Sequence, residues 1–219
     1  MEVPVGPQTN REAHTIERLT QQSLDSLTPE ERLRVCSAVC FYMVLEAEMG
    51  HTDGEMEDVT DFLAAMGLDS EDGTSPVRIE NGDISRPALS RAIRERYPDF
   101  GVASWQYREP GQVAEDDIEG MIAAGYIETE DEIDLFTDVG QVTDLKGIIG
   151  LGFTPIVTVA PGFAENRQRH AVVVDGWSDG KVHIVDPNAR NDADIFSEED
   201  FLAGIAEGSA VTVIFPKAA

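Results

Sequence analysis

Three short runs rich in β-branched residues, close together near the carboxyl end of the chain, constrain the fold most strongly. They cover residues 155–160, 171–175 and 181–185, and such side chains favour the pleated, half-buried surface of a strand. Only residues 176–180, which end in Asp-Gly, separate the second run from the third. Because this connection is too short for a crossover and Asp-Gly favours a tight turn, the sequence predicts an antiparallel hairpin.

The predicted hairpin brings two polar residues together at its open end. If it folds about Ser178 and Asp179, His170 lies beside Asp186. Facing residues are about 4.5–5.5 Å apart at Cβ, so the carboxylate could orient the imidazole and stabilise its cation, as in a catalytic triad. The alternative interpretations are an ordinary surface histidine and an Asp-Pro turn after a strand.

A triad also needs a nucleophile, and the chain has only two cysteines, Cys36 and Cys40. Both lie in a stretch with apolar residues at helical spacing, preceded by a capping box with proline at the first helical position, Thr28-Pro29-Glu30-Glu31. The pattern predicts one helix from Thr28 to Gly50. A continuous helix of this length would make Cys36 a core residue instead of a thiol at a helix amino end.

Three segments together resemble a known family. They are the cysteine segment CSAVCFYMVL, the later His-Ala-Val-Val-Val, and Asp-Pro at the end of the next strand. This order is similar to that of the papain-like bacteriocin-processing cysteine peptidases, cysteine peptidase family thirty-nine and its relatives. Residues 148–159 and 197–215 also resemble the family's helix and strand before the histidine and its closing helix and strand. The resemblance covers roughly residues 36–49 and 144–215.

The resemblance implies a papain-like α+β fold in which N-terminal helices pack on a C-terminal antiparallel sheet. It implies a single domain over 1–219, made of a helical part (1–68) with the cysteine, an acidic variable middle (69–141) and a sheet part (142–219) with His170 and Asp186. The implied activity is thiol hydrolysis of a peptide or protein in the cleft between helices and sheet, without a cofactor. Cys36 would be the nucleophile and its backbone N–H an oxyanion donor, His170 the base and then acid, and Asp186 the orienting carboxylate.

The cysteine segment departs from the family pattern at two positions. Ser37 replaces the glycine after the cysteine, and Glu30 stands where a glutamine would complete the oxyanion hole. A carboxylate there would repel the developing oxyanion. The alternative function is therefore a catalytically degenerate papain-like fold that binds peptides or proteins. A metal site at Cys36, Cys40 and His170 is disfavoured because neither a Cys-x-x-Cys motif nor a second histidine supports it, so no metal is expected.

The rest of the chain predicts helices first and antiparallel strands last, an α+β order. Residues 127–138 fit either an edge strand or a loop. The other predicted elements are helices near 10–24, 54–66, 85–97, 115–124 and 142–150, a strand over 102–107 and a surface loop over 69–85.

Charge is the outlying property of the composition. Asp and Glu number 42 against 16 Lys and Arg, a net charge of −26, and the acids are scattered along the chain. Scattered acids with few lysines resemble the surfaces of proteins from extremely halophilic archaea; a nucleic-acid mimic is the alternative. The absence of a basic patch argues against binding nucleic acid.

No signal peptide or membrane-length apolar run is evident, so we expect a cytoplasmic protein with no membrane partner. The oligomeric state is left open.

Overall fold

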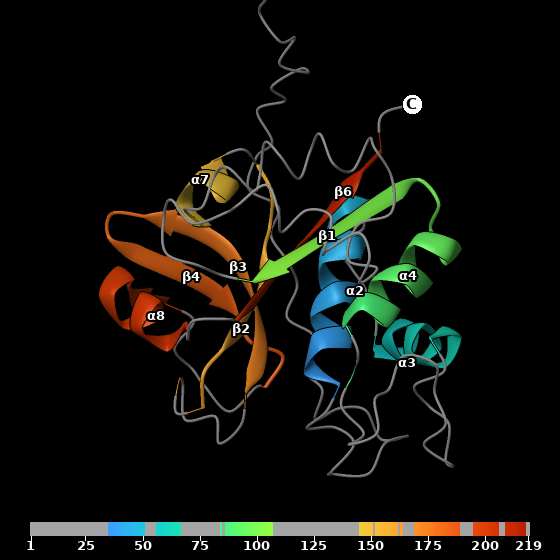
Figure 1. The fold of residues 1–219 in the computed structure, drawn as a ribbon, viewed down its shortest axis with the longest axis horizontal. Helices are drawn as coiled ribbons and strands as arrows, with labels where there is room; N and C mark the ends of the chain where they lie inside the picture. Colours follow the sequence, from blue (N-terminus) through green and yellow to red (C-terminus); the bar gives the residue numbers. More distant parts are fainter. Residues whose placement is uncertain are drawn as a thin grey trace, which may run out of the picture.

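The fold was analysed in a computed structural model that describes residues 35–50, 56–66, 84, 86–106, 145–150, 152–161, 163, 169–188, 195–205 and 209–217. Most helices lie in the first half of the chain and most strands in the second half (Figure 1). In chain order they are α2 (Cys36–Glu48), α3 (Met56–Ala65), α4 (Arg86–Arg96), β1 (Phe100–Gln106), α7 (Leu145–Gly150), β2 (Ile156–Val159), β3 (His170–Ser178), β4 (Lys181–Val185), β5 (Ile195–Ser197), α8 (Glu198–Gly204) and β6 (Ala210–Pro216).

The six strands form one sheet in the order β1-β6-β2-β3-β4-β5, and every neighbouring pair is antiparallel. The strand predicted over 102–107 is present as β1 and pairs with β6, the last strand of the chain. The sheet thus ties the middle of the sequence to its end. The predicted α+β arrangement of helices packed on an antiparallel sheet is confirmed.

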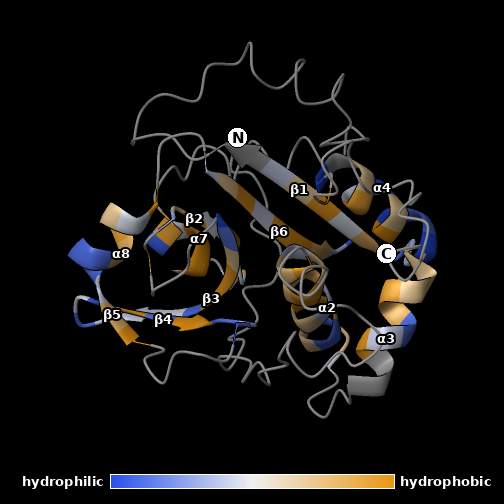
Figure 2. Ribbon diagram, turned by 90° about the horizontal axis from the view of Figure 1, so that it is seen from below, coloured by the Kyte–Doolittle hydropathy of each residue, from blue (hydrophilic) through white to orange (hydrophobic). Residues whose placement is uncertain are grey.

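Each face of the sheet has its own hydrophobic core, because successive residues of a strand point to opposite faces. On β3, Val173 belongs to the core under α2, α3 and α4. Its neighbours Val172 and Val174 belong to the core on the other face, together with Leu145 of α7 and Phe201 of α8. Figure 2 shows α2, α3 and α4 on one side of the molecule and α7 and α8 on the other.

Helix α2 is the centre of the first core. Ten of its thirteen residues are buried, and the helix is coloured as predominantly hydrophobic in Figure 2. A helix that is apolar on nearly all sides must be surrounded by protein. It packs on β2, β3 and β6 and against α3, so its first residue, Cys36, lies against the sheet.

The prediction of one continuous helix from Thr28 to Gly50 is wrong at its start. Val35, with φ −100° and ψ 4°, is outside the helix, and α2 begins at Cys36. Residues 28–34 lie outside the described residues. Local helix propensity is weak enough for tertiary contacts to override it, and Cys36, the first residue of α2, contacts His170 of the sheet. The predicted C-terminal stop is confirmed, since Gly50 has φ +79°.

The predicted hairpin is confirmed as β3 and β4, but its pivot differs from the prediction. The two turn residues are Asp179 (φ 54°) and Gly180 (φ 70°), and positive φ at both positions defines the type I′ turn that Asp-Gly favours. Ser178 pairs with Lys181, and a bulge between Val174 and Gly176 shifts the register. Bulges of this kind insert one extra residue in one strand. The strand ends are therefore offset from the pairing that the sequence predicted.

Other predicted elements are also present. The helices near 54–66, 85–97 and 142–150 correspond to α3, α4 and α7, and the run at 155–160 to β2. The helices near 10–24 and 115–124 and the segment 127–138 lie outside the described residues, as does the 69–85 loop apart from Ile84. Strand β5 was not predicted, because three residues, none of them buried, are too short a run to show an alternating pattern. None of the helices in the described part of the chain is both long and apolar enough to cross a bilayer.

Candidate active site

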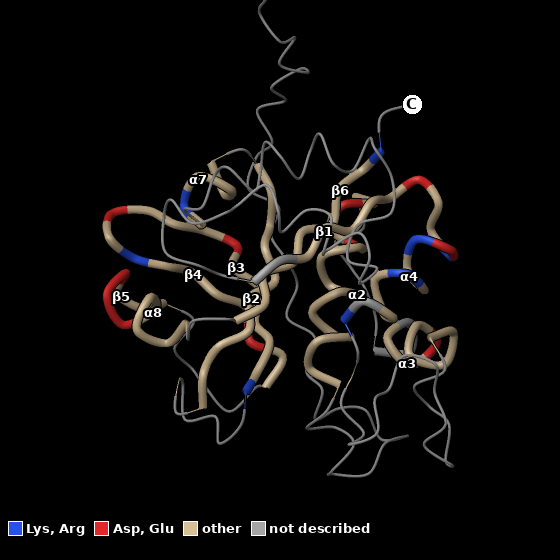
Figure 3. Tube along the Cα trace, viewed as in Figure 1, with Lys and Arg blue, Asp and Glu red and all other residues tan. Residues whose placement is uncertain are grey.

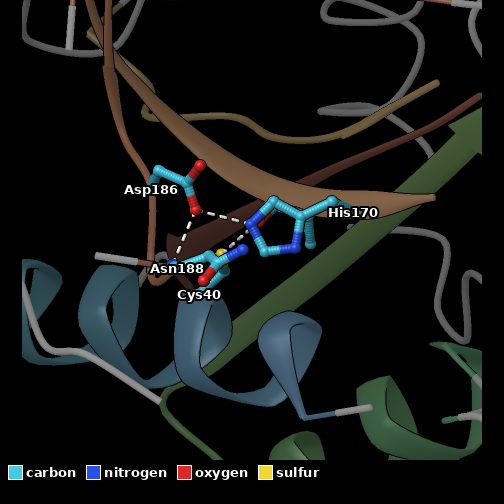
Figure 4. Close-up of polar contacts among 5 residues, drawn as sticks. Cys40, His170, Asp186 and Asn188 are labelled. Atoms are coloured by element: carbon cyan, nitrogen blue, oxygen red, sulfur yellow. Dashed lines mark hydrogen bonds and ion pairs between the residues drawn. The ribbon is translucent and has the colours of Figure 1, made fainter. Parts of the chain in front are cut away.

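His170 and Asp186 meet at the open end of the β3–β4 hairpin, as predicted. Nε2 of His170 lies 2.5 Å from Oδ1 of Asp186, and Figure 4 shows the two side chains facing each other above α2. The same oxygen accepts the backbone N–H of Asn188 at 2.7 Å. An aspartate that accepts the N–H two residues later forms an Asx turn. The Asp-Pro turn and the histidine contact are thus one arrangement, in which the turn fixes the carboxylate.

Cys36 reaches the same imidazole from α2. Its thiol hydrogen-bonds with His170. Since Nε2 of the ring is occupied by Asp186, the nitrogen left for the thiol is Nδ1. The structure therefore brings together the three residues that the sequence singled out: one from the first turn of a helix, one from the start of a strand and one from the turn after the next strand.

The two ionisable partners shift each other's pKa in opposite directions. Burial opposes the Cys36 thiolate, but the hydrogen bond to His170 and the positive charge of the imidazolium outweigh it, so the pKa of Cys36 is lowered. Burial also opposes the imidazolium, yet hydrogen bonds to Asp186 and Cys36 raise the pKa of His170 to about 10. Both shifts favour the pair in its thiolate and imidazolium form. The start of α2 adds the positive end of a helix dipole beside the thiolate.

Cys40 lies one helical turn after Cys36 but is in a different chemical state. Its side chain is fully buried, and its Sγ is 3.4 Å from the backbone oxygen of Ala171, the residue after His170. Burial, followed by the negative charges of Cys36 and Asp186, raises the pKa of Cys40 well above its ordinary value. Cys40 therefore stays a protonated thiol and holds the backbone next to His170.

The site is closely packed. The exposed fractions of Cys36, His170 and Asp186 are 7%, 5% and 1%. Oδ2 of Asp186 is buried without a hydrogen-bond partner, so Oδ1 alone binds both His170 and the backbone N–H of Asn188. A buried carboxylate that is not satisfied on one oxygen attracts a nearby cation more strongly than a solvated one does. This favours the protonated form of His170.

Two residues near the site were not singled out from the sequence. Asn188 contributes its backbone N–H to Asp186, and Arg86, at the start of α4, contributes a positive charge that lowers the pKa of Cys36. Neither belongs to a recognisable motif. Asn188 could have been found as the residue two positions after Asp186, where Asx turns close. Arg86 is fifty residues from Cys36 in sequence and has no comparable signal.

Two further expectations from the sequence concern Glu30 and a metal site. Glu30, which stands at the expected glutamine position, lies outside the described residues. Within the described residues, no three side chains of the Cys, His, Asp or Glu type are arranged to share a metal ion.

Comparison with known proteins bears on the fold. No model of a known protein family matches the chain. No curated protein matches it in sequence. Among solved structures, the fold is similar to that of a protein from Bacillus anthracis described as a candidate C39-like peptidase, with a TM-score of 0.50 and 13% sequence identity. The match covers 94% of this chain and 97% of that one. At this identity the likeness establishes the fold alone: the chain has the mixed helix and antiparallel-sheet fold of a C39-like peptidase.

Proposed function

We propose that the protein is a papain-like thiol hydrolase that cleaves peptide bonds, with Cys36, His170 and Asp186 as its catalytic triad. The observation that supports this most directly is the continuous chain of contacts from the Cys36 thiol through His170 to Oδ1 of Asp186. The thiolate is the nucleophilic form of cysteine, and these contacts stabilise it. The likeness in fold to a protein described as a peptidase supports the same reaction class.

Each residue has a defined role in this reaction. The Cys36 thiolate attacks the scissile carbonyl carbon, and protonated His170 gives its proton to the leaving amine. Neutral His170 then takes a proton from the water that hydrolyses the thioester, which regenerates the thiolate and the imidazolium. Asp186 keeps the ring oriented through both steps and stabilises its cation.

The amino end of α2 supplies the oxyanion donor. Val35 caps the helix without a side-chain hydrogen bond, and the first N–H groups of a helix have no partner within the helix. Cys36 is the first residue of α2, so its backbone N–H is next to the carbon that its own thiolate would attack. Donors placed where negative charge develops are a major source of rate acceleration. The peptide would lie between the helices and the sheet.

The acidic surface and the compartment belong to the same proposal. We infer one catalytic domain that works in the reducing cytoplasm of a salt-accumulating archaeon, because an active-site thiolate must stay reduced and the charge pattern resembles that of halophilic proteins. The net charge of −26 comes from Asp and Glu across the whole chain. Its partner would be a peptide or protein, not nucleic acid.

A second candidate is a papain-like module that binds peptides without cleaving them. The low exposure of Cys36, 7%, favours it, because a nucleophile must be reached by its substrate. Ser37, in place of the glycine expected after the cysteine, points the same way. A binding module would hold a peptide over the same three residues but would gain nothing from a stabilised thiolate.

Cleavage of a mixed peptide library in molar KCl, followed by mass spectrometry, separates the two candidates. We expect the native protein to cleave the library, Cys36→Ala to abolish cleavage, and His170→Ala to lower it at least about 100-fold. Asp186→Asn should also lower it. The matched controls on the same hairpin are His183→Ala and Asp179→Asn, which lie away from the thiol and should keep the native rate.

Alkylation by iodoacetamide between pH 5 and 9 provides a test that needs no substrate. Cys36 should react well below the pH at which an ordinary thiol does, His170→Ala should remove this advantage, and Cys40 should stay unlabelled until the protein unfolds. A native Cys36 that reacts no faster than it does in His170→Ala would contradict the hydrolase. Peptides captured uncleaved, equally by native protein and Cys36→Ala, would favour the binding module.

A further inference from the structure

Arg86 reaches from the start of α4 into the interface between α2 and the sheet. Helix α4 packs on β1, but the guanidinium extends past that strand to the next two. One of its N–H groups donates to Oγ1 of Thr212 on β6 at 3.0 Å, and another donates to Oγ1 of Thr158 on β2. Two hydroxyls on neighbouring strands thus fix both the position and the plane of the guanidinium.

The hydroxyls that hold Arg86 belong to a polar row in an otherwise apolar core. Oγ1 of Thr212 is also 2.7 Å from Oγ of Ser104 on β1, and both side chains are fully buried. Burying polar groups costs free energy unless they are hydrogen-bonded. These contacts satisfy the hydroxyls, and because hydroxyls are neutral, they hold the guanidinium without cancelling its charge.

This polar row lies directly beside the candidate active site. Thr158 pairs with Ala171 across β2 and β3, and Ala171 both follows His170 and accepts the thiol of Cys40. Cys40 is one helical turn from Cys36 on α2. The charge of Arg86 acts on both thiols, in each case in favour of the thiolate.

We propose that Arg86 is a positioning residue for the nucleophile: its guanidinium, held by Thr158 and Thr212, keeps a permanent positive charge behind the Cys36 thiol and favours its ionised form. This inference rests on the proposed role of Cys36. The ionisable groups around Cys36 in the described residues are His170 on β3, Asp186 after β4, Cys40 on α2 and Arg86 on α4. Of these, His170 and Arg86 carry positive charge, and only His170 gives its proton away during the reaction.

The permanence of the charge is what distinguishes Arg86 from His170. A guanidinium does not lose its proton in proteins. When His170 has protonated the leaving group, its own charge is gone, and Arg86 is then the cation that remains near the sulfur. It would stabilise the thiolate as the leaving group when water hydrolyses the thioester, at the step where His170 begins neutral.

The pH profile of Cys36 alkylation by iodoacetamide tests the proposal, with the four variants Arg86→Gln, Arg86→Lys, Thr158→Val and Arg91→Gln. We expect Arg86→Gln to move the midpoint to higher pH and to slow labelling about three- to tenfold at pH 6, because the thiolate fraction falls tenfold for each unit by which the pKa rises. The alkylation rate on the plateau above this midpoint should stay close to the native one, whereas a general disturbance of the structure around Cys36 would alter it.

The other variants are matched controls. Arg86→Lys keeps the charge and should keep the midpoint close to the native one. Arg91→Gln removes the same charge from an exposed position of the same helix and should move nothing. Thr158→Val removes one of the two hydrogen bonds that hold Arg86 and should shift the midpoint less than Arg86→Gln does. If Arg86→Gln fails to fold, the Thr158→Val profile tests the proposal.

Two results would overturn the proposal: an Arg86→Gln or Thr158→Val profile that superimposes on the native one, or an Arg86→Lys shift as large as that of Arg86→Gln. Either could occur while native Cys36 still reacts at acidic pH and depends on His170, which would leave the proposed hydrolase intact. A native Cys36 that shows no acid-shifted reactivity would instead contradict both proposals.

Discussion

At the scale of single residues, the site consists of three buried side chains in contact, Cys36, His170 and Asp186, and the charge of each affects the ionisation of its neighbour. His170 stands between a carboxylate on Nε2 and a thiol on its other nitrogen. The pKa of His170 rises from 6.5 to about 10 in the folded protein. Its protonation therefore stabilises the fold fully below about pH 6.5, and this contribution is lost as the pH rises through about 10.

An NMR titration of the His170 ring tests this coupling. The imidazole should stay protonated through neutral pH and titrate near pH 10. Cys36→Ala removes both a hydrogen bond and a negative charge from the ring, so the pKa of His170 should fall. Asp186→Asn should lower it as well, because the carboxylate supplies the largest favourable contribution. A His170 pKa that is identical in native protein and Cys36→Ala would show that the thiol does not contact the ring.

At the scale of elements, the sequence predicted what depends on local pattern and missed what depends on distant contacts. The β3–β4 hairpin followed from β-branched runs and Asp-Gly. The contact between His170 and Asp186 was predicted from a pairing two residues out of register, since Val173 pairs with Val185. The two side chains still meet, and an Asx turn fixes the carboxylate of Asp186. Local pattern carries no information about the bulge between Val174 and Gly176 or about the orientation of the Asp186 side chain.

The start of α2 is the clearest failure of local reasoning. The capping box at Thr28 predicted a helix that would run through Cys36, yet Val35 is not helical. At this start, Cys36 contacts His170, 134 positions later in the chain, which local pattern cannot show. Arg86 was missed for the same reason, since its partners are on β2 and β6. Cys36 was proposed from the resemblance of its segment to that of cysteine peptidases, because local pattern placed it inside a helix.

The packing of β1 against β6 gives a prediction at this scale. Gly101 pairs with Phe215, and a Cβ at residue 101 would lie 2.2 Å from the Phe215 ring. Phe215 is buried, with only 6% of its surface exposed, so the ring has little room to move. Gly101→Ala should lower the free energy of unfolding by about 1–3 kcal/mol, measured by urea denaturation.

Gly150→Ala is the matched control for this substitution. A Cβ at residue 150 meets nothing within 4 Å, and the residue is the last of α7. This change should be neutral or stabilise the protein by up to about 1 kcal/mol. Equal stability of the two variants would mean that β1 and β6 do not pack as described.

At the scale of the whole molecule, negative charge dominates the surface outside the two cores. Figure 3 shows acidic residues on both sides of the described part, on α3 as well as around β5 and α8. One lysine, Lys146, lies 3.6 Å from Glu198. Such a half-exposed pair contributes little, and 16 basic residues cannot offset 42 acidic ones. The compact state is therefore destabilised by self-repulsion.

The melting temperature should consequently depend steeply on salt. Screening shortens the range of charge repulsion from about 8 Å at physiological salt to about 3 Å at 1 M, so we expect the melting temperature to rise markedly between 0.1 M and 2 M KCl, followed by circular dichroism. A variant with the exposed acids Asp61, Glu95 and Glu199 changed to Asn, Gln and Gln should show a shallower rise, because each change removes a repelling charge without touching either core. A melting temperature of the native protein that does not change with salt, or a rise that is equally steep in the variant, would mean that repulsion between surface acids does not limit the stability of this fold. The inference of adaptation to high salt would then be wrong.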